Sequence, residues 1–404
     1  MPLRPPAGFI SAFFDPLRNP NAPTIGTATA GDASASVAFT APSNVGGSAI
    51  SGYGAISTPE GITGTSTTSP VTVTGLTNGT AYTFAVWAIN TYGPSAYSAS
   101  SGSATPAASR AIFGGGVPGS GYTNVISQVT IATTGNATSF GNLPEGRADL
   151  FSCCSSTVAL FGGGNAPGPS QQFKVKRITF ASGGTATAWG DLATGVSYTN
   201  AISNSTIGYV FAGFDNGANL DPPLIQALTI ASGGTQSTFG NCTVKGRGCT
   251  GVASPTRGVM AMGYNDDLGG YINVLNYITF ATAGNAVDFG DLITSTAGGG
   301  SGSNSTRGLF AGGNFSGGQS NTIEYITIAT TGNATDFGDL TLARTTRGAA
   351  SSTRVVFGGG YEQGNTSNII DYVTIATTGN ALDFGDLTVA VYANGACSNG
   401  HGGL

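Results

Sequence analysis

Apolar and polar residues alternate along the first part of the chain. ASVAFTAP, ISGYGAIS, SPVTVTGL and AYTFAVWAIN, all within residues 35–90, each place every second side chain on one face. This period of two is typical of strands with one buried face, and Gly, Asn and Pro turn signals separate the runs. We therefore predict about seven short strands between residues 23 and 107.

From residue 108 onward the pattern repeats itself. An aromatic residue followed by Gly recurs at intervals of 49, 50, 50, 48 and 47 residues, at Phe140, Trp189, Phe239, Phe289, Phe337 and Phe384. A glycine cluster such as IFGGG (112–116) and a run such as VTIATTGNATSFGNL accompany each aromatic residue. Fixed spacing of this kind indicates a repeat architecture. We predict six units of four short strands at about 108–157, 158–206, 207–256, 257–305, 306–352 and 353–404.

The phase of the repeats predicts how the array closes. The first repeat begins at Arg110, on the second strand of a sheet, so that sheet has no first strand before it in the sequence. The last residues align with the first strand of a seventh unit and stop where its second strand would begin. We therefore predict that a closing strand, 394–399, pairs with 109–116, which would leave no sheet edge exposed.

Residues that recur in register are assigned structural roles. Glycines of the FGGG clusters are expected to allow close approach between neighbouring sheets, and the TTGN segments to close tight hairpins. The arginines before four of the six second strands are predicted to act as caps or in salt bridges rather than as a binding ring. The acids that follow Phe-Gly or Trp-Gly in four units are predicted to bond their own backbone, with calcium as the alternative. These positions are Arg110, Arg257, Arg307, Arg354, Asp191, Asp291, Asp339 and Asp386.

Composition narrows the fold class and the chemistry. The chain has 66 glycines and 33 charged residues in 404, yet 40% of its residues are hydrophobic, which favours an all-β protein over a disordered one. A single histidine, His401, cannot supply a multi-histidine metal site, and five scattered cysteines lack metal-ligand spacing. A net charge of −5 argues against nucleic-acid binding. We predict no enzyme activity, no cofactor, no metal site, no signal peptide and no membrane insertion.

The loops that differ between repeats are the predicted binding surface. Loops after the glycine clusters should emerge on one face of the array together with the linkers between units. They carry aromatic and acidic side chains that suit sugar rings, hydroxyl groups or a protein partner. The candidate residues are Tyr122, Phe214, Asp215, Tyr264, Asp266, Asp267, Tyr271, Phe315, Tyr361 and Glu362.

The N-terminal segment forms a third region. Residues 1–22 contain Phe9, Phe13 and Phe14 between prolines, which is too short for a core and too apolar for a flexible linker. We predict a docking arm whose aromatic residues are buried in an assembly, with a frayed terminus as the alternative.

Two families resemble parts of the chain. In GLTNGTAYTFAVWAINTYGPS, Leu76 precedes Tyr82 by six residues, and the following strand alternates inward, so residues 23–107 resemble a fibronectin type III domain with a tyrosine corner. The family usually has Trp on its second strand, where this chain has Phe39. Residues 108–404 resemble a kelch-type six-bladed β-propeller, although TTGNxxxFGDL replaces the usual Tyr and Trp spacing.

The combination resembles the virion appendage proteins of bacterial viruses. That resemblance implies a tail-fibre-like protein that is made in the host cytoplasm and located in the virion. Its partners would be other virion proteins and a glycan or protein of the host surface, and a homo-oligomer within a symmetric assembly stays open. Two alternatives remain: a bacterial lectin-like or adhesion protein, and a glycan-active enzyme that uses loop carboxylates.

Overall fold

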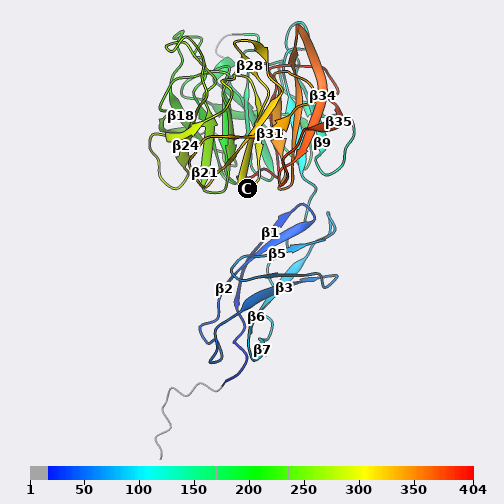
Figure 1. Cartoon of the computed structure of the whole chain (residues 1–404). Coiled ribbons are helices and arrows are strands. Elements are labelled where there is room, and N and C mark those ends of the chain that lie inside the picture. The colour runs from blue at the N-terminus through cyan, green and yellow to red at the C-terminus, as the bar shows by residue number, and fades with distance from the viewer. Residues whose placement is uncertain (1–16, 169–170, 235) are drawn as a thin grey trace, which may run out of the picture. The chain divides into compact units, whose positions relative to one another are not determined.

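The computed structural model describes residues 17–168, 171–234 and 236–404. Apart from one short helical turn, η1 (Gln171–Phe173), its regular elements are β-strands, so the predicted all-β class is confirmed. The chain divides into two compact units, with the boundary between Ala108 and Ser109. Figure 1 draws the whole chain, and each unit is described below by itself.

The first unit is a sandwich of two antiparallel sheets. One sheet has the order β1 (Thr24–Gly31), β2 (Ser34–Thr40), β5 (Val71–Thr74). The other has the order β4 (Thr63–Ser66), β3 (Gly52–Thr58), β6 (Thr83–Asn90), β7 (Gly93–Pro94). The seven strands match the predicted number, and alternate residues of β2, β3, β5 and β6 enter one shared core.

The predicted tyrosine corner is present in this sandwich. Tyr82 is fully buried, and its hydroxyl oxygen accepts a hydrogen bond from the backbone N–H of Thr77 at 3.0 Å. The same hydroxyl donates to Oε2 of Glu60 at 2.5 Å. Phe39, at the position where tryptophan was expected, packs on Tyr53 with ring centroids 4.5 Å apart. The corner therefore ties the turn before β6 to the core.

The predicted arm falls mostly outside the described residues, and so do Phe9, Phe13 and Phe14. Its last residues are bonded to the sandwich. The N–H of Arg18 donates to the carbonyl of Gly46, and the N–H of Asn21 to the carbonyl of Asn44, both at 3.0 Å. Asn90 Nδ2 also donates to the carbonyl of Arg18 at 2.9 Å. Residues 18–21 are thus held on the surface of the sandwich.

The second unit consists of six sheets, each with four antiparallel strands in the order first to fourth. Sheet one contains β36 (Gly395–Ser398), β8 (Arg110–Gly114), β9 (Val125–Thr130) and β10 (Thr138–Asn142), and β14 (Gly184–Thr185) pairs parallel with β10. Sheet two contains β11 (Phe151–Cys154), β12 (Val158–Gly162), β13 (Lys174–Thr179) and β15 (Thr187–Asp191). Sheet three contains β16 (Asn200–Ser203), β17 (Ile207–Phe211), β18 (Leu224–Thr229) and β19 (Gln236–Asn241).

The remaining sheets follow the same order. Sheet four contains β20 (Thr250–Ala253), β21 (Arg257–Ala261), β24 (Val274–Thr279) and β25 (Val287–Asp291). Sheet five contains β26 (Gly300–Ser303), β27 (Arg307–Ala311), β30 (Thr322–Thr327) and β31 (Thr335–Asp339). Sheet six contains β32 (Arg347–Ala350), β33 (Arg354–Glu362), β34 (Asn365–Thr374) and β35 (Leu382–Asp386). Two small hairpins lie in loops: β22 (Tyr264–Asn265) with β23 (Gly270–Tyr271), and β28 (Asn314–Phe315) with β29 (Gly318–Gln319).

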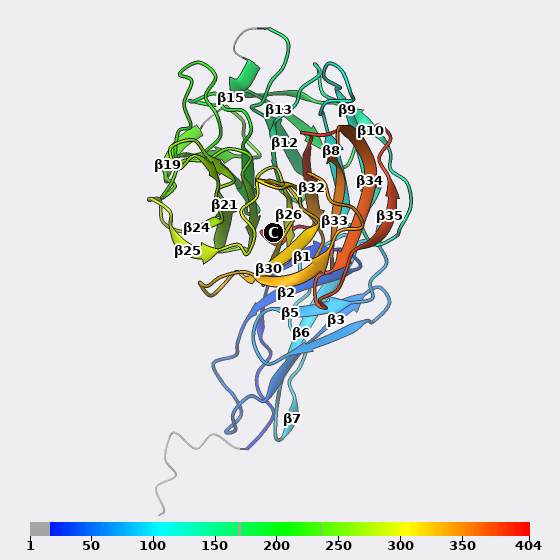
Figure 2. The ribbon, with the colours of Figure 1, turned by 45° about the horizontal axis from the view of Figure 1, so that its top comes forward.

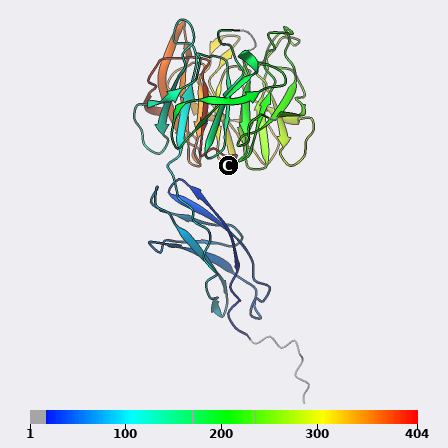
Figure 3. The same cartoon turned by 180° about the vertical axis from the view of Figure 1, so that it is seen from behind.

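The last strand of the chain completes the first sheet. β36 pairs antiparallel with β8, with Gly395 opposite Gly114 and Ser398 opposite Ala111, which is the pairing that the repeat phase predicts. In Figures 1 and 3 the last sheet, coloured orange to red, lies beside the cyan first sheet. The first strands of successive sheets contact one another from β11 through β16, β20, β26 and β32 to β36, and β36 contacts β11. Figure 2 shows the sheets following one another around a centre.

The apolar core of this unit lies between the sheets rather than within them. Six separate clusters of buried side chains each join two consecutive sheets, and one of them joins sheet six to sheet one. In that closing cluster Phe113 and Val129 of sheet one pack with Val356 and Phe384 of sheet six. Each sheet therefore needs both neighbours in order to bury its two faces.

The repeated TGN and Phe-Gly segments bond to each other across these junctions. The N–H of Gly332 donates to the carbonyl of Phe289, and the N–H of Ala334 to the carbonyl of Asp291, both at 2.8 Å. The second of these bonds recurs at five junctions, including that between sheets one and six. A Cβ on Gly338 would lie 2.5 Å from the carbonyl oxygen of Gly379, so this close approach requires glycine. The TTGN segments thus turn between strands, as predicted, and also join sheets.

The in-register arginines connect neighbouring sheets as well. Nη1 of Arg257, Arg307 and Arg354 donates to backbone carbonyls of the next sheet, and each guanidinium lies 4.4–4.8 Å from the centre of a tyrosine ring on its own sheet. Arg110 donates to the carbonyl of Phe180 at 2.9 Å. The predicted structural role is present, but it acts through carbonyl oxygens and aromatic rings instead of salt bridges.

The prediction for the recurring aspartates is wrong in its mechanism. Among the described residues, Asp291, Asp339 and Asp386 make no side-chain bond to their own backbone, whereas Asp191 pairs with Lys174 at 2.8 Å. It is their backbone N–H and carbonyl groups that bond to the neighbouring sheet. The FGGG glycines, in turn, accommodate a linker: a Cβ on Gly115 would lie 2.5 Å from the carbonyl oxygen of Arg147.

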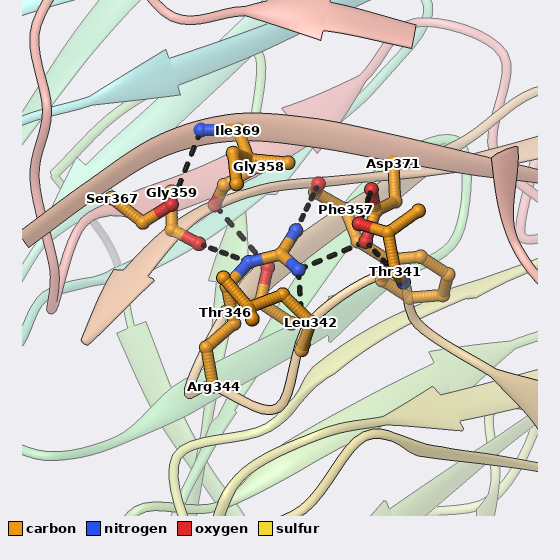
Figure 4. A network of polar contacts seen from close by, with 10 residues as sticks. All are labelled: Thr341, Leu342, Arg344, Thr346, Phe357, Gly358, Gly359, Ser367, Ile369 and Asp371. Carbon is orange, nitrogen blue, oxygen red and sulfur yellow. Dashed lines mark hydrogen bonds and ion pairs between the residues drawn. The ribbon is translucent and has the colours of Figure 1, made fainter. Parts of the chain in front are cut away.

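A buried polar network fixes the linker before sheet six (Figure 4). Arg344 and Asp371 are both fully buried, and Nη1 of Arg344 lies 2.8 Å from Oδ2 of Asp371. Arg344 also donates to the carbonyls of Gly359 and Phe357, and Asp371 accepts from the hydroxyl of Thr341 at 2.6 Å. Because every charge has a partner, this pair anchors the linker without an uncompensated buried ion.

Candidate ligand-binding site

The variable loops and the linkers between sheets lie at the same end of the second unit. Each sheet is antiparallel and each linker runs from a fourth strand to the next first strand, so both kinds of connection leave at one end. Isolated bridges join linkers to loops, among them Ser197 with Phe214, Arg247 with Tyr264 and Ala297 with Asn314. We call this end the loop end.

Backbone hydrogen bonds join successive linkers in a circle of linkers around the centre of the loop end, although among the described residues no such bond joins Ala393 to the linker before sheet six. The N–H groups of Asp149, Tyr198, Gly248 and Gly298 donate to the carbonyls of Ala393, Asp149, Tyr198 and Gly248, at 2.6–3.0 Å. These residues each stand two positions before a first strand and have φ between 52° and 71°. A positive φ is uncommon for Asp, Tyr and Ala. These bonds hold the linker residues in place, and the side chains of Asp149 and Tyr198 line a hollow at this end.

A depression of about 280 Å³ lies inside this circle. Its lining includes Asp149, Tyr198, Arg247, Tyr264, Arg347 and Tyr392. These residues come from linkers, from one loop and from the start of β32, so at least four sheets contribute to it. The result is a small hollow with tyrosine walls, two arginines and one carboxyl group.

Arg347 forms part of the depression and is only 8% exposed. Its Nη1 donates to the carbonyls of Thr346 at 3.0 Å, Gly298 at 3.1 Å and Gly299 at 3.4 Å. Burial lowers the pKa of this guanidinium, and the charge of Asp149 opposes that shift. An arginine nevertheless keeps its proton in proteins, so the depression has a permanent positive charge.

Asp149 has an unusual environment for a carboxyl group. Burial raises its pKa to about 6, although a hydrogen bond from Asn165 Nδ2 at 3.0 Å and the charge of Arg347 both act to lower it. The charge of Asp149 in turn raises the pKa of the Tyr198 phenol, and burial adds to that shift. The charge of the depression therefore changes near pH 6.

Arg247 holds the rim of the depression. Its Nη1 and Nη2 donate to the two carboxylate oxygens of Asp266 at 2.7 and 2.9 Å, and Nη1 lies 3.7 Å from Asp221. The guanidinium also lies 5.0 Å from the ring centre of Tyr264 and 5.4 Å from that of Phe214. This arginine is neutralised by carboxylates and positions two aromatic rings.

The structure brings some predicted site residues together and separates others. Tyr264 and Tyr271 pack edge to face at 5.2 Å and both line the depression, while Phe315 joins them around a second hollow of about 660 Å³. Phe214 and Asp266 belong to the Arg247 cluster. Other residues have local roles: Asp215 accepts the N–H groups of Gly217 and Ala218, and Asp267 pairs with Lys245.

The three remaining candidates lie toward sheets one and six. Tyr361 packs against Tyr392 at 5.1 Å, so it supports a wall of the depression from behind. Tyr122 is 43% exposed, and Glu362 is partly exposed at the end of β33.

Sequence reasoning missed the residues that define the depression: Asp149, Tyr198, Arg247, Arg347 and Tyr392. They stand in or next to the linkers, which were predicted to lie at this end but contributed none of the candidate residues. One signal was available, because Asp149 and Tyr198 occupy a repeat position where two other units have glycine.

The opposite end of the first strands holds a buried thiol cluster. The free thiols of Cys154 and Cys397 are buried, and His401 Nε2 donates to the carbonyl of Cys154 at 2.9 Å while Nδ1 accepts the N–H of Gly403. These three residues line a cavity of about 70 Å³, which holds no more than a few water molecules.

Neither a cluster of metal-binding side chains nor a membrane-spanning helix occurs in the part of the chain that the structure describes. Across the ranges 17–168, 171–234 and 236–404, no group of three or more His, Cys, Asp or Glu side chains is placed to hold a metal ion. Within the same ranges no helix has the length and apolar character needed to cross a bilayer.

Comparison with known protein families agrees with the tyrosine corner and the seven-strand sandwich. Residues 21–103 match the fibronectin type III domain. This match ends before the first repeat. None of the curated proteins compared with the chain matches it. Fibronectin type III domains are adhesion or scaffold modules in many settings, so this one assigns no chemistry by itself.

Proposed function

We propose that the chain is a non-enzymatic structural protein of a bacteriophage particle, a tail-fibre-like or other appendage protein. Its fibronectin type III domain and N-terminal arm would attach it to other virion proteins. Its repeats would form a six-bladed kelch-like β-propeller whose loop end contacts a host-surface glycan or protein, or a neighbouring virion protein. The resemblance of the sequence to virion appendage proteins supports the location in the virion. The geometry of the loop end supports the binding role.

Three features support the propeller architecture. Each of them joins the last sheet to the first sheet as well as joining neighbouring sheets. These are the contacts among first strands, the apolar clusters between sheets, and the bond from sheet one to sheet six through Ala137 and Asp386. A closed array of this kind removes sheet edges and fixes the positions of the loops.

The binding role depends on one observation, the tyrosine-walled depression inside the circle of linkers. Aromatic faces with polar edges suit sugar rings, and a site built on a rigid frame loses little entropy on binding. The depression is slightly smaller than the range of roughly 300–1,000 Å³ usual for drug-sized ligands, so it suits one sugar residue of a longer chain.

A non-enzymatic role is supported by the placement of the possible nucleophiles and bases. Cys154 and Cys397 are buried at the end away from the loops, and His401, which is partly buried, bonds to the carbonyl of Cys154 there. The acids of the loops are mostly engaged by arginine, lysine or backbone N–H groups. A hydrolase of polysaccharide would need two free carboxyl groups facing one bond.

A glycan array of bacterial surface polysaccharides tests the binding role. We expect wild-type protein to retain specific glycans, and the variants Tyr264→Ala and Tyr271→Ala to lose them. Tyr97→Ala is the matched control, because Tyr97 is exposed on the sandwich and distant in sequence. If all three variants bind glycans as well as the wild-type protein, the assignment of the binding site to Tyr264 and Tyr271 is wrong.

The virion setting needs a separate test. Mass spectrometry of purified particles should detect the protein, and deletion of residues 1–16 should abolish its incorporation without changing the melting of the second unit. Absence from particles, together with retained glycan binding, would favour the lectin-like or adhesion alternative. Release of product from host polysaccharide would favour the glycan-active enzyme.

A further inference from the structure

Three arginines of the second unit are at least nine-tenths buried, and only two of them have a carboxylate partner. Arg344 pairs with Asp371 at 2.8 Å, and Arg147 pairs with Glu145 at 2.7 Å. Arg347 forms no ion pair with any described residue. The charge of Asp149 acts on Arg347 without forming an ion pair with it, and a buried charge that lacks a contact ion pair is costly to the folded state.

Two nitrogen atoms of the Arg347 guanidinium have no hydrogen-bond partner in the described part of the chain. Its bonds to protein all leave from Nη1, so Nε and Nη2 have no hydrogen-bond partner among the described residues. The side chain lines the 280 Å³ depression and also the narrow cavity between the first strands. The Arg347 side chain thus lines the depression, and the N–H groups of Nε and Nη2 are left for a ligand.

We infer that the depression binds the carboxylate of an acidic sugar residue, of the uronic or sialic acid class, with Arg347 as the carboxylate-binding group. The inference rests on the proposed function and names the ligand class for the same site. Nε and Nη2 of a guanidinium form a planar pair of donors that matches the two oxygens of a carboxylate. Tyr198, Tyr264 and Tyr392 would contact the sugar ring, and the volume admits one such residue.

Arg247 does not compete for this role. Both of its terminal nitrogens are bound to Asp266, and Asp221 lies beside it, so it offers no unshared positive charge. Arg347 is therefore the cation of the depression that an anionic ligand can reach.

Asp149 is the charge that opposes such a ligand. It faces the Arg347 guanidinium, the phenols of Tyr198 and Tyr392 and the Asn165 amide, and Cys249 lies near Arg347. Because burial raises the pKa of Asp149 to about 6, the carboxyl is ionised at pH 7.5 and largely protonated at pH 5. Ligand carboxylates of this class stay ionised at both values. Binding should therefore be tighter at pH 5 than at pH 7.5.

Calorimetric titration of the full chain with four methyl glycosides tests the inference. The probes are the glucuronide and the N-acetylneuraminide as acidic members, and the glucoside and the N-acetylglucosaminide as neutral ones. We expect at least one acidic probe to bind about tenfold or more tightly than both neutral probes, because a charge-assisted bidentate contact is lost without the carboxylate. The two acidic arms distinguish a uronic from a sialic acid ligand.

Two variants then assign the residues. Arg347→Gln should abolish the preference for acidic probes, with its melting curve showing that the unit is folded. Asp149→Asn should raise the affinity for the acidic probe about threefold or more at pH 7.5 and remove the difference between pH 5 and pH 7.5. Misfolding cannot produce a gain in affinity. Lys174→Gln is the control, because it removes an exposed positive charge outside the depression.

The outcomes separate this inference from the proposed function. Neutral probes that bind as tightly as acidic ones, with no effect of Asp149→Asn, would overturn the acidic-sugar inference and leave glycan binding intact. Binding of an acidic probe that depends on Arg347, in a protein absent from particles, would support the inference and overturn the virion role. If none of the four probes binds, the inference is wrong.

Discussion

The sandwich and the six-sheet unit bury their apolar side chains in different places. The sandwich has one core between two sheets, closed by Tyr82 and Phe39, and needs no other part of the chain. In the six-sheet unit the core is divided among six junctions, each shared by two sheets. A mutation in the sandwich core should therefore affect that core alone. A mutation in one junction of the six-sheet unit should weaken both sheets that share it, and through them the packing of the other sheets.

The largest difference between the units should appear when the closing strand is removed. Deletion of residues 394–404 exposes the edge of β8 and one face of β32. We expect calorimetry to show loss of the cooperative transition of the six-sheet unit, while the sandwich transition remains. A synthetic peptide of residues 390–404 should restore the lost transition. A deletion variant that melts like the full chain would contradict a closed array.

A smaller effect is expected when one buried junction is broken. Arg344→Met leaves the Asp371 carboxylate fully buried without its cation, which should destabilise the six-sheet unit by about 3–5 kcal/mol. The double variant Arg344→Met/Asp371→Leu should regain most of that loss. Urea unfolding measures both, and an equal loss in the two variants would show that packing, rather than charge, holds this linker.

The substitution Asp149→Asn should stabilise the six-sheet unit, whereas Arg344→Met destabilises it. The pKa of Asp149 is raised to about 6 in the folded protein from 3.8, so stability falls as pH rises from 3.8 through 6 and the ionised carboxylate disfavours the fold above that range. The variant lacks this titration and should be more stable than wild type at pH 7.5 by up to about 3 kcal/mol, with no difference below pH 4. Asn also tolerates the positive φ of this position. Melting curves across this pH range measure the effect, and a pH-independent difference would argue against it.

The smallest effect should be confined to the sandwich. Tyr82→Phe removes the acceptor for the Thr77 N–H and the donor to Glu60, at a cost of about 1–3 kcal/mol. The transition of the six-sheet unit should not move. Tyr97→Phe, at an exposed position, serves as the control and should change neither transition.

The strands and their pairing could be predicted from sequence because the patterns that encode them recur along the chain. Alternation identified the inward face of β6, and the repeat phase identified the partner of β8 before any contact was known. The recurring aspartates show the limit of the method. The recurring Asp was given a side-chain role, although what recurs is a backbone hydrogen bond such as that from the N–H of Ala334 to the carbonyl of Asp291.

The candidate site could be predicted only in part. Tyr264 and Tyr271 stand seven residues apart in one loop, so their proximity follows from a local hairpin. Asp149, Tyr198 and Arg347 meet because linkers from different sheets converge on one centre, and their residue types share no pattern. Convergence of this kind depends on the curvature of the whole array, which no local spacing encodes.

The position of β36 sets an order for biosynthesis. A ribosome makes β8 early, but the innermost strand of that sheet comes from residues 395–398. The sandwich has all of its strands long before then and can fold during translation. The six-sheet unit has to wait with an open edge until residues 395–398 have been made, and a product terminated before them lacks the strand that pairs with β8. Pairing of β36 therefore acts as a check on translation through residue 398, and shorter products would be left exposed to proteases.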